Sequence, residues 1–240
     1  MSYVKMNCFV AHYMLVKLAN DYLKYSYHLT INHVKLLYFI LYLYDENKHI
    51  DISQLEMYNK QSKFSILKML QYLYQNNWIS KERDDKDQRK LVITMSEQQK
   101  NKIHLLFNEI DEMLESRKIV INQRVSNHIL YFIKCGEVLD DMDEQLMINN
   151  LSLEEVYLLA ILLNNDNKMT VKYMRYKTQV GIVSLSSIIK KLNQKGYIIK
   201  ERSLEDERTI ILKLNDCKAS LILSIIESCY NTLKQGMKNL

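Results

Sequence analysis

Two charged segments of the chain contain residue types that bind nucleic acid. Each begins with Lys-Glu-Arg, and each continues to an aspartate and then to a second arginine. The residues are Lys81, Glu82, Arg83, Asp87 and Arg89 in the first segment and Lys200, Glu201, Arg202, Asp206 and Arg208 in the second. Arginine pairs with phosphate through two parallel hydrogen bonds, and narrow A·T minor grooves attract it through their enhanced negative potential. The pattern therefore indicates duplex DNA, and A+T-rich DNA in particular, as the partner.

Each segment is predicted to be the tip of a β-hairpin, and we call these tips the wings. The aspartate and the second arginine are two residues apart, so on a strand both project on the same side. A carboxylate in that position can brace the guanidinium, which then loses less freedom on entering a groove. The predicted wing contacts are Arg83, Lys86, Asp87, Arg89, Arg202, Asp206, Glu207 and Arg208. Two other interpretations remain: the tips are charged because they are solvated, or the Asp–Arg pair stabilises the turn.

The two wings indicate that the chain is one module written twice. Positions 81 and 200 differ by 119 residues in a chain of 240. Such self-similarity at a fixed offset is the sequence signature of repeated domains. We predict one domain over residues 1–119 and a second over 120–240. The join near 117–123 has no linker rich in Pro, Gly or Ser, so we expect continuous or nearly continuous helix there.

Hydrophobic periodicity predicts the same order of elements in both copies. In the first copy we expect helices over 8–25, 31–44, 51–58, 64–76 and 96–120, with strands over 78–83 and 89–95. In the second copy we expect helices over 125–139, 183–194 and 217–234, a helix near 151–159, and strands over 198–202 and 209–214. This order is that of a winged helix-turn-helix. The fold class is therefore mainly α with small β-hairpin wings (α+β), as two tandem winged helix-turn-helix domains related by a pseudo-twofold.

The helix before each wing is the predicted reader helix, the one that enters the major groove. In the first, Leu67, Leu70 and Leu73 are expected to face the core, and Gly196 is expected to end the second. The side chains expected to face DNA are polar or cationic, as phosphate and base-edge contacts require. They are Gln61, Ser62, Lys63, Ser65 and Lys68 in the first copy and Lys177, Thr178, Gln179, Ser184 and Ser187 in the second.

The remaining composition argues against most other functions. The net charge of +5 is compatible with DNA, and with four glycines and no proline the chain cannot build a Gly-rich phosphate loop. No metal-ligand spacing or hydrolase motif is present, so we expect no metal, no cofactor and no enzyme. Neither a secretory signal nor a membrane-length apolar run is present, so a cytoplasmic location is expected. Cys8 and Cys135 are either redox-sensing thiols or small buried hydrophobes.

At these residues the chain resembles the staphylococcal accessory regulator (Sar) family, a branch of the MarR-like winged-helix regulators. The resemblance rests on the two wing patterns and on Asn7-Cys8-Phe9 at the start of the first helix. It covers both halves, so the tandem two-domain subgroup is the match. It implies a transcription factor that binds A+T-rich promoters and controls virulence genes. The family's wing reads Asp-Glu-Arg, whereas the first wing has Gln88 in the middle position.

Three hypotheses of function follow. The leading one is a monomeric DNA-binding regulator whose two halves form an internal pseudo-dimer. The second is a plasmid-type replication initiator with tandem winged helices. The third is a protein-interaction antagonist of related regulators that has lost DNA binding, and the wing arginines in both copies argue against it.

Overall fold

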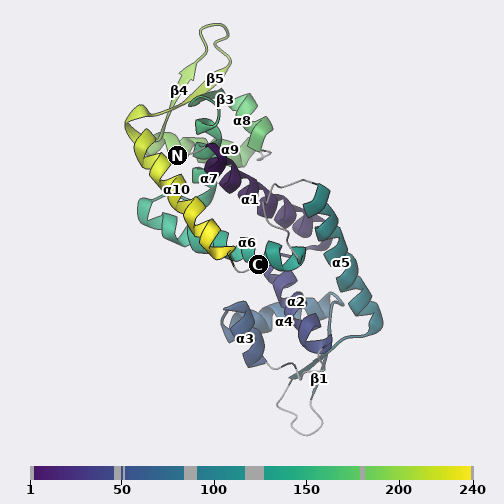
Figure 1. The fold of residues 1–240 in the computed structure, drawn as a ribbon. Helices are drawn as coiled ribbons and strands as arrows, with labels where there is room; N and C mark the ends of the chain where they lie inside the picture. Colours follow the sequence, from purple (N-terminus) through teal and green to yellow (C-terminus); the bar gives the residue numbers. More distant parts are fainter. Residues whose placement is uncertain are drawn as a thin grey trace. The chain divides into compact units, whose positions relative to one another are not determined.

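The computed structural model describes residues 3–45, 50, 52–83, 91–116, 127–178 and 182–238 (Figure 1). The helices and the two hairpin strands follow the same order in both copies. The first copy comprises α1 Tyr3–Tyr22, the π-helical turn η1 Leu23–Tyr27, α2 Ile31–Asp45, α3 Ile52–Asn59, α4 Lys63–Gln75, β1 Ser80–Arg83, β2 Leu91–Thr94 and α5 Glu97–Ser116. The second comprises α6 His128–Leu146, η2 Met147–Asn149, α7 Leu153–Leu163, β3 Lys168–Thr170, α8 Val171–Thr178, α9 Ile182–Gln194, β4 Ile198–Arg202, β5 Ile210–Leu214, η3 Asp216–Lys218 and α10 Ala219–Gly236.

The chain groups into two compact units that do not follow the sequence halves. Unit 1 contains residues 1–16 together with 134–240, and unit 2 contains residues 17–133. The division therefore falls inside α1 and inside α6. The predicted domain boundary at 119/120 and the predicted helical join lie outside the described residues.

In unit 2, the first turn of α5 is held by a reciprocal cap. The Gln99 amide donates to Ser96 Oγ (3.2 Å), and the Ser96 amide donates to Gln99 Oε1 (2.9 Å). This satisfies two of the backbone donors that a helix start leaves without partners. Farther along α5, Glu109 accepts hydrogen bonds from the hydroxyls of Tyr22 and Tyr27. The end of α1 and the η1 turn are thereby tied to α5.

Unit 1 has α7 at its centre, where almost every side chain is buried. Its start is another capping box, in which Ser152 and Glu155 exchange side-chain and backbone hydrogen bonds. Residues of α1 pack onto this core. The ring of Tyr13 lies 4.4 Å from that of Tyr157, and the Tyr157 hydroxyl donates to Met14 Sδ (2.6 Å). The N-terminal helix of the first copy is therefore part of the core of the second.

Matching hydrogen bonds end the two reader helices. The Trp78 amide donates to Leu73 O in unit 2, and the Tyr197 amide donates to Leu192 O in unit 1, both at 2.9 Å. Each pair differs from its counterpart by the predicted offset of 119 residues. Gly196 precedes Tyr197 with φ of +71°, a conformation that glycine adopts without strain. The predicted stop at Gly196 is thus confirmed.

Small antiparallel sheets follow the reader helices. In unit 2, β1 pairs with β2 from Ser80↔Thr94 to Arg83↔Leu91. In unit 1 the described strands form a three-stranded sheet of order β3-β5-β4, and the β4–β5 hairpin projects away from the helices (Figure 1). The predicted hairpins are confirmed, whereas β3 and α8 were not expected as separate elements.

Two predicted features are corrected by packing. Helix α6 continues to Leu146 instead of ending at 139, because Met142 and Leu146 extend its buried side. Leu67 does not face the core: it is 38% exposed, while the buried row of α4 is Ile66, Met69, Leu70 and Leu73. The apolar side chains of α4 form two adjacent rows on the helix, and the segments that pack against α4 determine which row is buried.

Candidate nucleic-acid interface

The first reader helix, α4, begins with a hydroxyl cap. Ser62 adopts an extended backbone and its Oγ accepts from the Ser65 amide at 3.4 Å, while Ser65 Oγ donates to Gln61 Oε1 at 2.9 Å. These three predicted DNA contacts therefore also organise the helix start. Lys63 and Lys68 are exposed on the outer side of α4.

The second reader helix, α9, has the same division of faces. Its buried row is Leu185, Ile188, Ile189 and Leu192. Ser184 and Ser187 are exposed, on the side that the sequence predicted. Both copies thus place exposed polar side chains of a helix next to a hairpin.

The helix before α9 was misassigned at the sequence level. Lys177 and Thr178 belong to α8 and not to the reader helix, and Gln179 lies outside the described residues. Thr178 is completely buried and its hydroxyl donates to Met174 O (2.9 Å), so its predicted contact with DNA is wrong. The 119-residue offset instead pairs Thr178 with Asn59, which is also buried.

Helix α8 is a cationic, aromatic surface that the sequence reasoning missed. Lys172, Arg175 and Lys177 are exposed, the rings of Tyr173 and Tyr176 stack at 6.3 Å, and Lys177 Nζ lies 5.4 Å from the Tyr173 ring. The first helix of a helix-turn-helix crosses the DNA backbone, where such cations bind phosphate. The 119-residue offset pairs α8 with α3 and α9 with α4, and this signal in the sequence separates the two helices.

The equivalent helix of unit 2 has a different character. At the position of Arg175, α3 has Glu56, and at the position of Tyr176 it has Met57, which is 67% exposed. The two helix-turn-helix surfaces therefore differ in charge although their backbones follow the same plan.

The second wing has an organised tip. The carboxylate of Asp206 accepts from the Arg208 amide (3.0 Å) and from the Thr209 hydroxyl (2.8 Å). The guanidinium of Arg202 donates to Glu207 O at 2.9 Å. The contacts of Asp206 are therefore those of a turn-stabilising residue, and it is Arg202 that a backbone carbonyl holds in place. No described side chain pairs with the guanidinium of Arg208, which is exposed and available to an anion.

The described part of the first wing is its base. Arg83 ends β1 and is exposed, whereas Lys86, Asp87 and Arg89 lie outside the described residues. Lys81 ties this base to the reader helix, because its Nζ donates to Gln71 Oε1 (2.9 Å) and lies 5.2 Å from the Tyr74 ring.

The two candidate redox cysteines are not activated. Burial raises the pKa of the Cys8 thiol, and it raises that of the completely buried Cys135 still more strongly. A reactive cysteine requires a thiolate and hence a lowered pKa. The environment of Cys135 is that of a small buried hydrophobe, whereas Cys8 is half-buried, with its Sγ 3.7 Å from His12 Nδ1.

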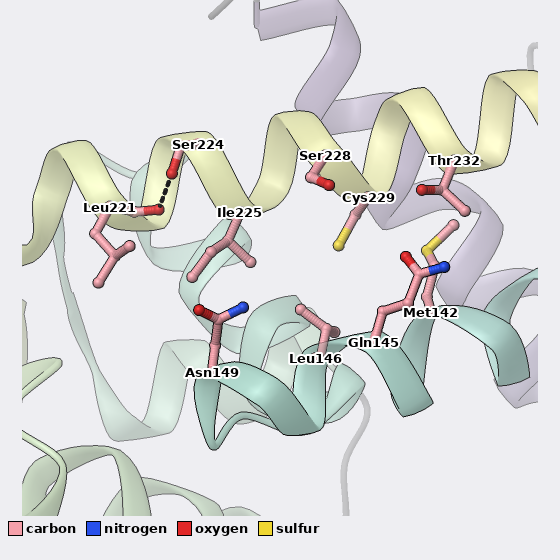
Figure 2. A pocket seen from close by; sticks show the side chains of 10 residues that line it. All are labelled: Met142, Gln145, Leu146, Asn149, Leu221, Ser224, Ile225, Ser228, Cys229 and Thr232. Carbon is pink, nitrogen blue, oxygen red and sulfur yellow. Dashed lines mark hydrogen bonds between the residues drawn. The ribbon is translucent and has the colours of Figure 1, made fainter.

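A cleft of about 240 Å³ lies between α6 and α10 of unit 1 (Figure 2). Its walls are Met142, Gln145, Leu146, Asn149, Leu221, Ser224, Ile225, Ser228, Cys229 and Thr232. None of these is charged, Ser224 Oγ already donates to Leu221 O (2.8 Å), and burial raises the pKa of Cys229 to about 12. The cleft thus offers neutral groups, and burial favours the protonated form of its one thiol.

The described residues contain no cluster of His, Cys, Asp and Glu that would hold a metal ion. No single described helix is long and apolar enough to cross a membrane, and only the bent pair His128–Asn149 and Leu153–Leu163 passes that test by length and composition.

Comparison with known proteins identifies the family. A family profile described as "Transcriptional regulator SarA/Rot" matches residues 19–106 and 144–225, once in each copy. The chain belongs to the SarA/Rot family of transcriptional regulators. Membership confirms the predicted Sar-type assignment, and the double match confirms the tandem arrangement. The chain is thus a DNA-binding transcriptional regulator, from a family of regulators and not of enzymes.

This SarA/Rot family member is also similar to individual known proteins. The HTH-type transcriptional regulator SarU of Staphylococcus aureus (strain NCTC 8325 / PS 47) is 25% identical over 242 residues, covering 97% of this chain and 96% of SarU. SarR of S. aureus (strain USA300) is 30% identical over 86 residues, which are 35% of this chain and 75% of SarR. Among solved structures, the match to apo MarR from E. coli covers 49% of this chain and 87% of the MarR chain, with 15% identity and a TM-score of 0.43.

Proposed function

We propose that this chain regulates transcription by binding double-stranded A+T-rich promoter DNA in the cytoplasm, with sequence or shape selectivity. Reader helices α4 and α9 enter major grooves, and the wing arginines enter minor grooves. The controlled genes are virulence genes, as the Sar resemblance implies.

The second wing is the observation that carries this proposal. Its tip is held by hydrogen bonds of Asp206 and Arg202, and it presents the Arg208 guanidinium with no described partner. A preorganised hairpin tip loses little backbone freedom on binding, and narrow A·T minor grooves attract arginine most strongly. The exposed serines of α9 and the cations of α8 lie in the same helix-turn-helix, which supplies the major-groove and phosphate contacts.

Fluorescence anisotropy with matched A+T-rich and G·C-rich duplexes, at several salt concentrations, tests the proposal. We expect preference for the A+T-rich duplex and affinity that falls steeply with salt, because released counterions drive binding. Arg208→Ala should weaken binding by about 1–3 kcal/mol if it contacts a base edge, or lower the salt slope by about one unit if it contacts phosphate. Equal affinity for the two duplexes together with a flat salt dependence would overturn the proposal.

We also infer that the protein acts as a monomer, because one chain already contains both copies of the winged module. Sedimentation velocity should show a single species of chain mass at micromolar concentration. A stable dimer under those conditions would contradict an internal pseudo-dimer.

A further inference from the structure

The outer face of reader helix α4 is apolar at two positions. Phe64 is 79% exposed and Leu67 is 38% exposed. They are three residues apart, so they are neighbours on one side of the helix. The core of unit 2 does not need them, because Ile66 and Leu70 fill the inner face of α4.

Exposed cations lie along the chain beside this pair. Lys60 precedes α4, Lys63 opens it, and Lys68 follows Leu67, all with exposed side chains. The cations beside the apolar pair are complementary to the anionic DNA backbone. The apolar pair itself is complementary to the one apolar group in the major groove. That group is the C5-methyl of thymine, which apolar side chains contact.

The second copy has an apolar residue type, Val183, at the position of Phe64 but differs at the position of Leu67. The anchors Leu73 and Leu192 set the repeat register, which pairs Leu67 with Ser186 and Lys68 with Ser187. Both serines are exposed. The outer face of α9 therefore offers hydroxyl groups where α4 offers a leucine and a lysine.

We propose that Phe64 and Leu67 are specificity-determining residues that contact thymine C5-methyl groups in the major groove. The DNA half bound by α4 is recognised by apolar contact, and the half bound by α9 by hydrogen bonds. The preferred site is accordingly not a perfect palindrome. This inference rests on the proposed DNA-binding function and adds the base and the chemical group that are recognised.

The test uses the full chain and the tightest duplex that it selects from a randomised pool. Each thymine of that duplex is replaced in turn by deoxyuridine, which removes only the methyl group. We expect one or two positions at which affinity falls about fourfold per methyl, equivalent to ~0.8 kcal/mol. Phe64→Ala and Leu67→Ser should weaken binding to the thymine duplex and abolish the difference between thymine and uracil at those positions.

A matched control is Ser186→Ala, which changes the equivalent position of α9. It should leave the uracil sensitivity assigned to α4 intact. Phe64→Ala should also keep the parent's circular dichroism and Tm, because the ring is largely exposed. If Leu67→Ser unfolds, the Phe64→Ala result decides alone.

Three outcomes would overturn the inference. One is a selected duplex in which no thymine is sensitive to uracil. Another is a Phe64→Ala variant that binds like the parent with the same uracil sensitivity, which would leave the apolar pair for a protein partner. The third is a chain that selects no duplex, in which case the proposed function fails as well; the first two outcomes leave DNA binding itself intact.

Discussion

Removing the Asp206 carboxylate should weaken DNA binding even though it removes a negative charge. The carboxylate holds the Arg208 amide and the Thr209 hydroxyl at 3.0 and 2.8 Å. A hydrogen bond of this kind contributes about 0.5–1.5 kcal/mol net, and the tip is exposed, so the two bonds together order it by about 1–2 kcal/mol. In Asp206→Ala the tip becomes ordered only when it binds DNA, so the free energy of ordering is subtracted from the free energy of binding.

The opposing electrostatic effect is smaller. One unit charge about 10 Å from a phosphate interacts by about 0.4 kcal/mol in water, and salt reduces this further. The expected net result for Asp206→Ala is therefore about threefold to fifteenfold weaker binding, measured by anisotropy on an A+T-rich duplex.

Two further variants separate the turn from the charge. Asp206→Asn removes the charge but keeps an oxygen that accepts from the Arg208 amide, so it should bind about as tightly as the parent. Glu207→Ala removes a neighbouring charge while retaining the carbonyl that Arg202 uses, so it should bind up to about twofold more tightly. If Asp206→Ala binds as tightly as Glu207→Ala, Asp206 acts only as a charge and the reasoning is refuted.

Three other predictions concern the fold. Lys195→Met should lower the free energy of unfolding, measured in urea, by about 3 kcal/mol. The reason is that the buried Glu155 carboxylate, 2.7 Å from Lys195 Nζ, loses its cation. Adding Glu155→Gln should recover part of the loss. Burial lowers the pKa of His12, so below about pH 6.5 the unfolded state takes up a proton before the folded state does, and stability falls. His12→Asn should therefore show a smaller drop in Tm between about pH 7.5 and 5.5 than the parent protein. Residues 120–240 expressed alone should lack cooperative unfolding by circular dichroism, because residues 1–16 belong to the same compact unit. A peptide of residues 1–16 should restore it. Cooperative unfolding without the peptide would contradict this packing.

Local signals in the sequence were sufficient for much of the plan. The 119-residue repeat, the stop at Gly196 and the hairpins after both reader helices are all confirmed. Each of these depends on hydrogen bonds or side-chain alternation within a few residues, so residue type and spacing determine it directly.

Other features depended on contacts between distant segments. The burial of Thr178 and the exposure of Leu67 follow from which face the rest of the fold covers, and periodicity alone leaves that choice open. The N-terminal helix packs against Tyr157, more than a hundred residues away, although its apolar spacing fits many surfaces. Asp206 bonds to its own turn and not to a guanidinium, which strand alternation could not distinguish. The sequence by itself determined the repeated module and its charged wings, whereas the tertiary structure decided which side chains of that module remain available to DNA, because burial depends on neighbours that local spacing does not name.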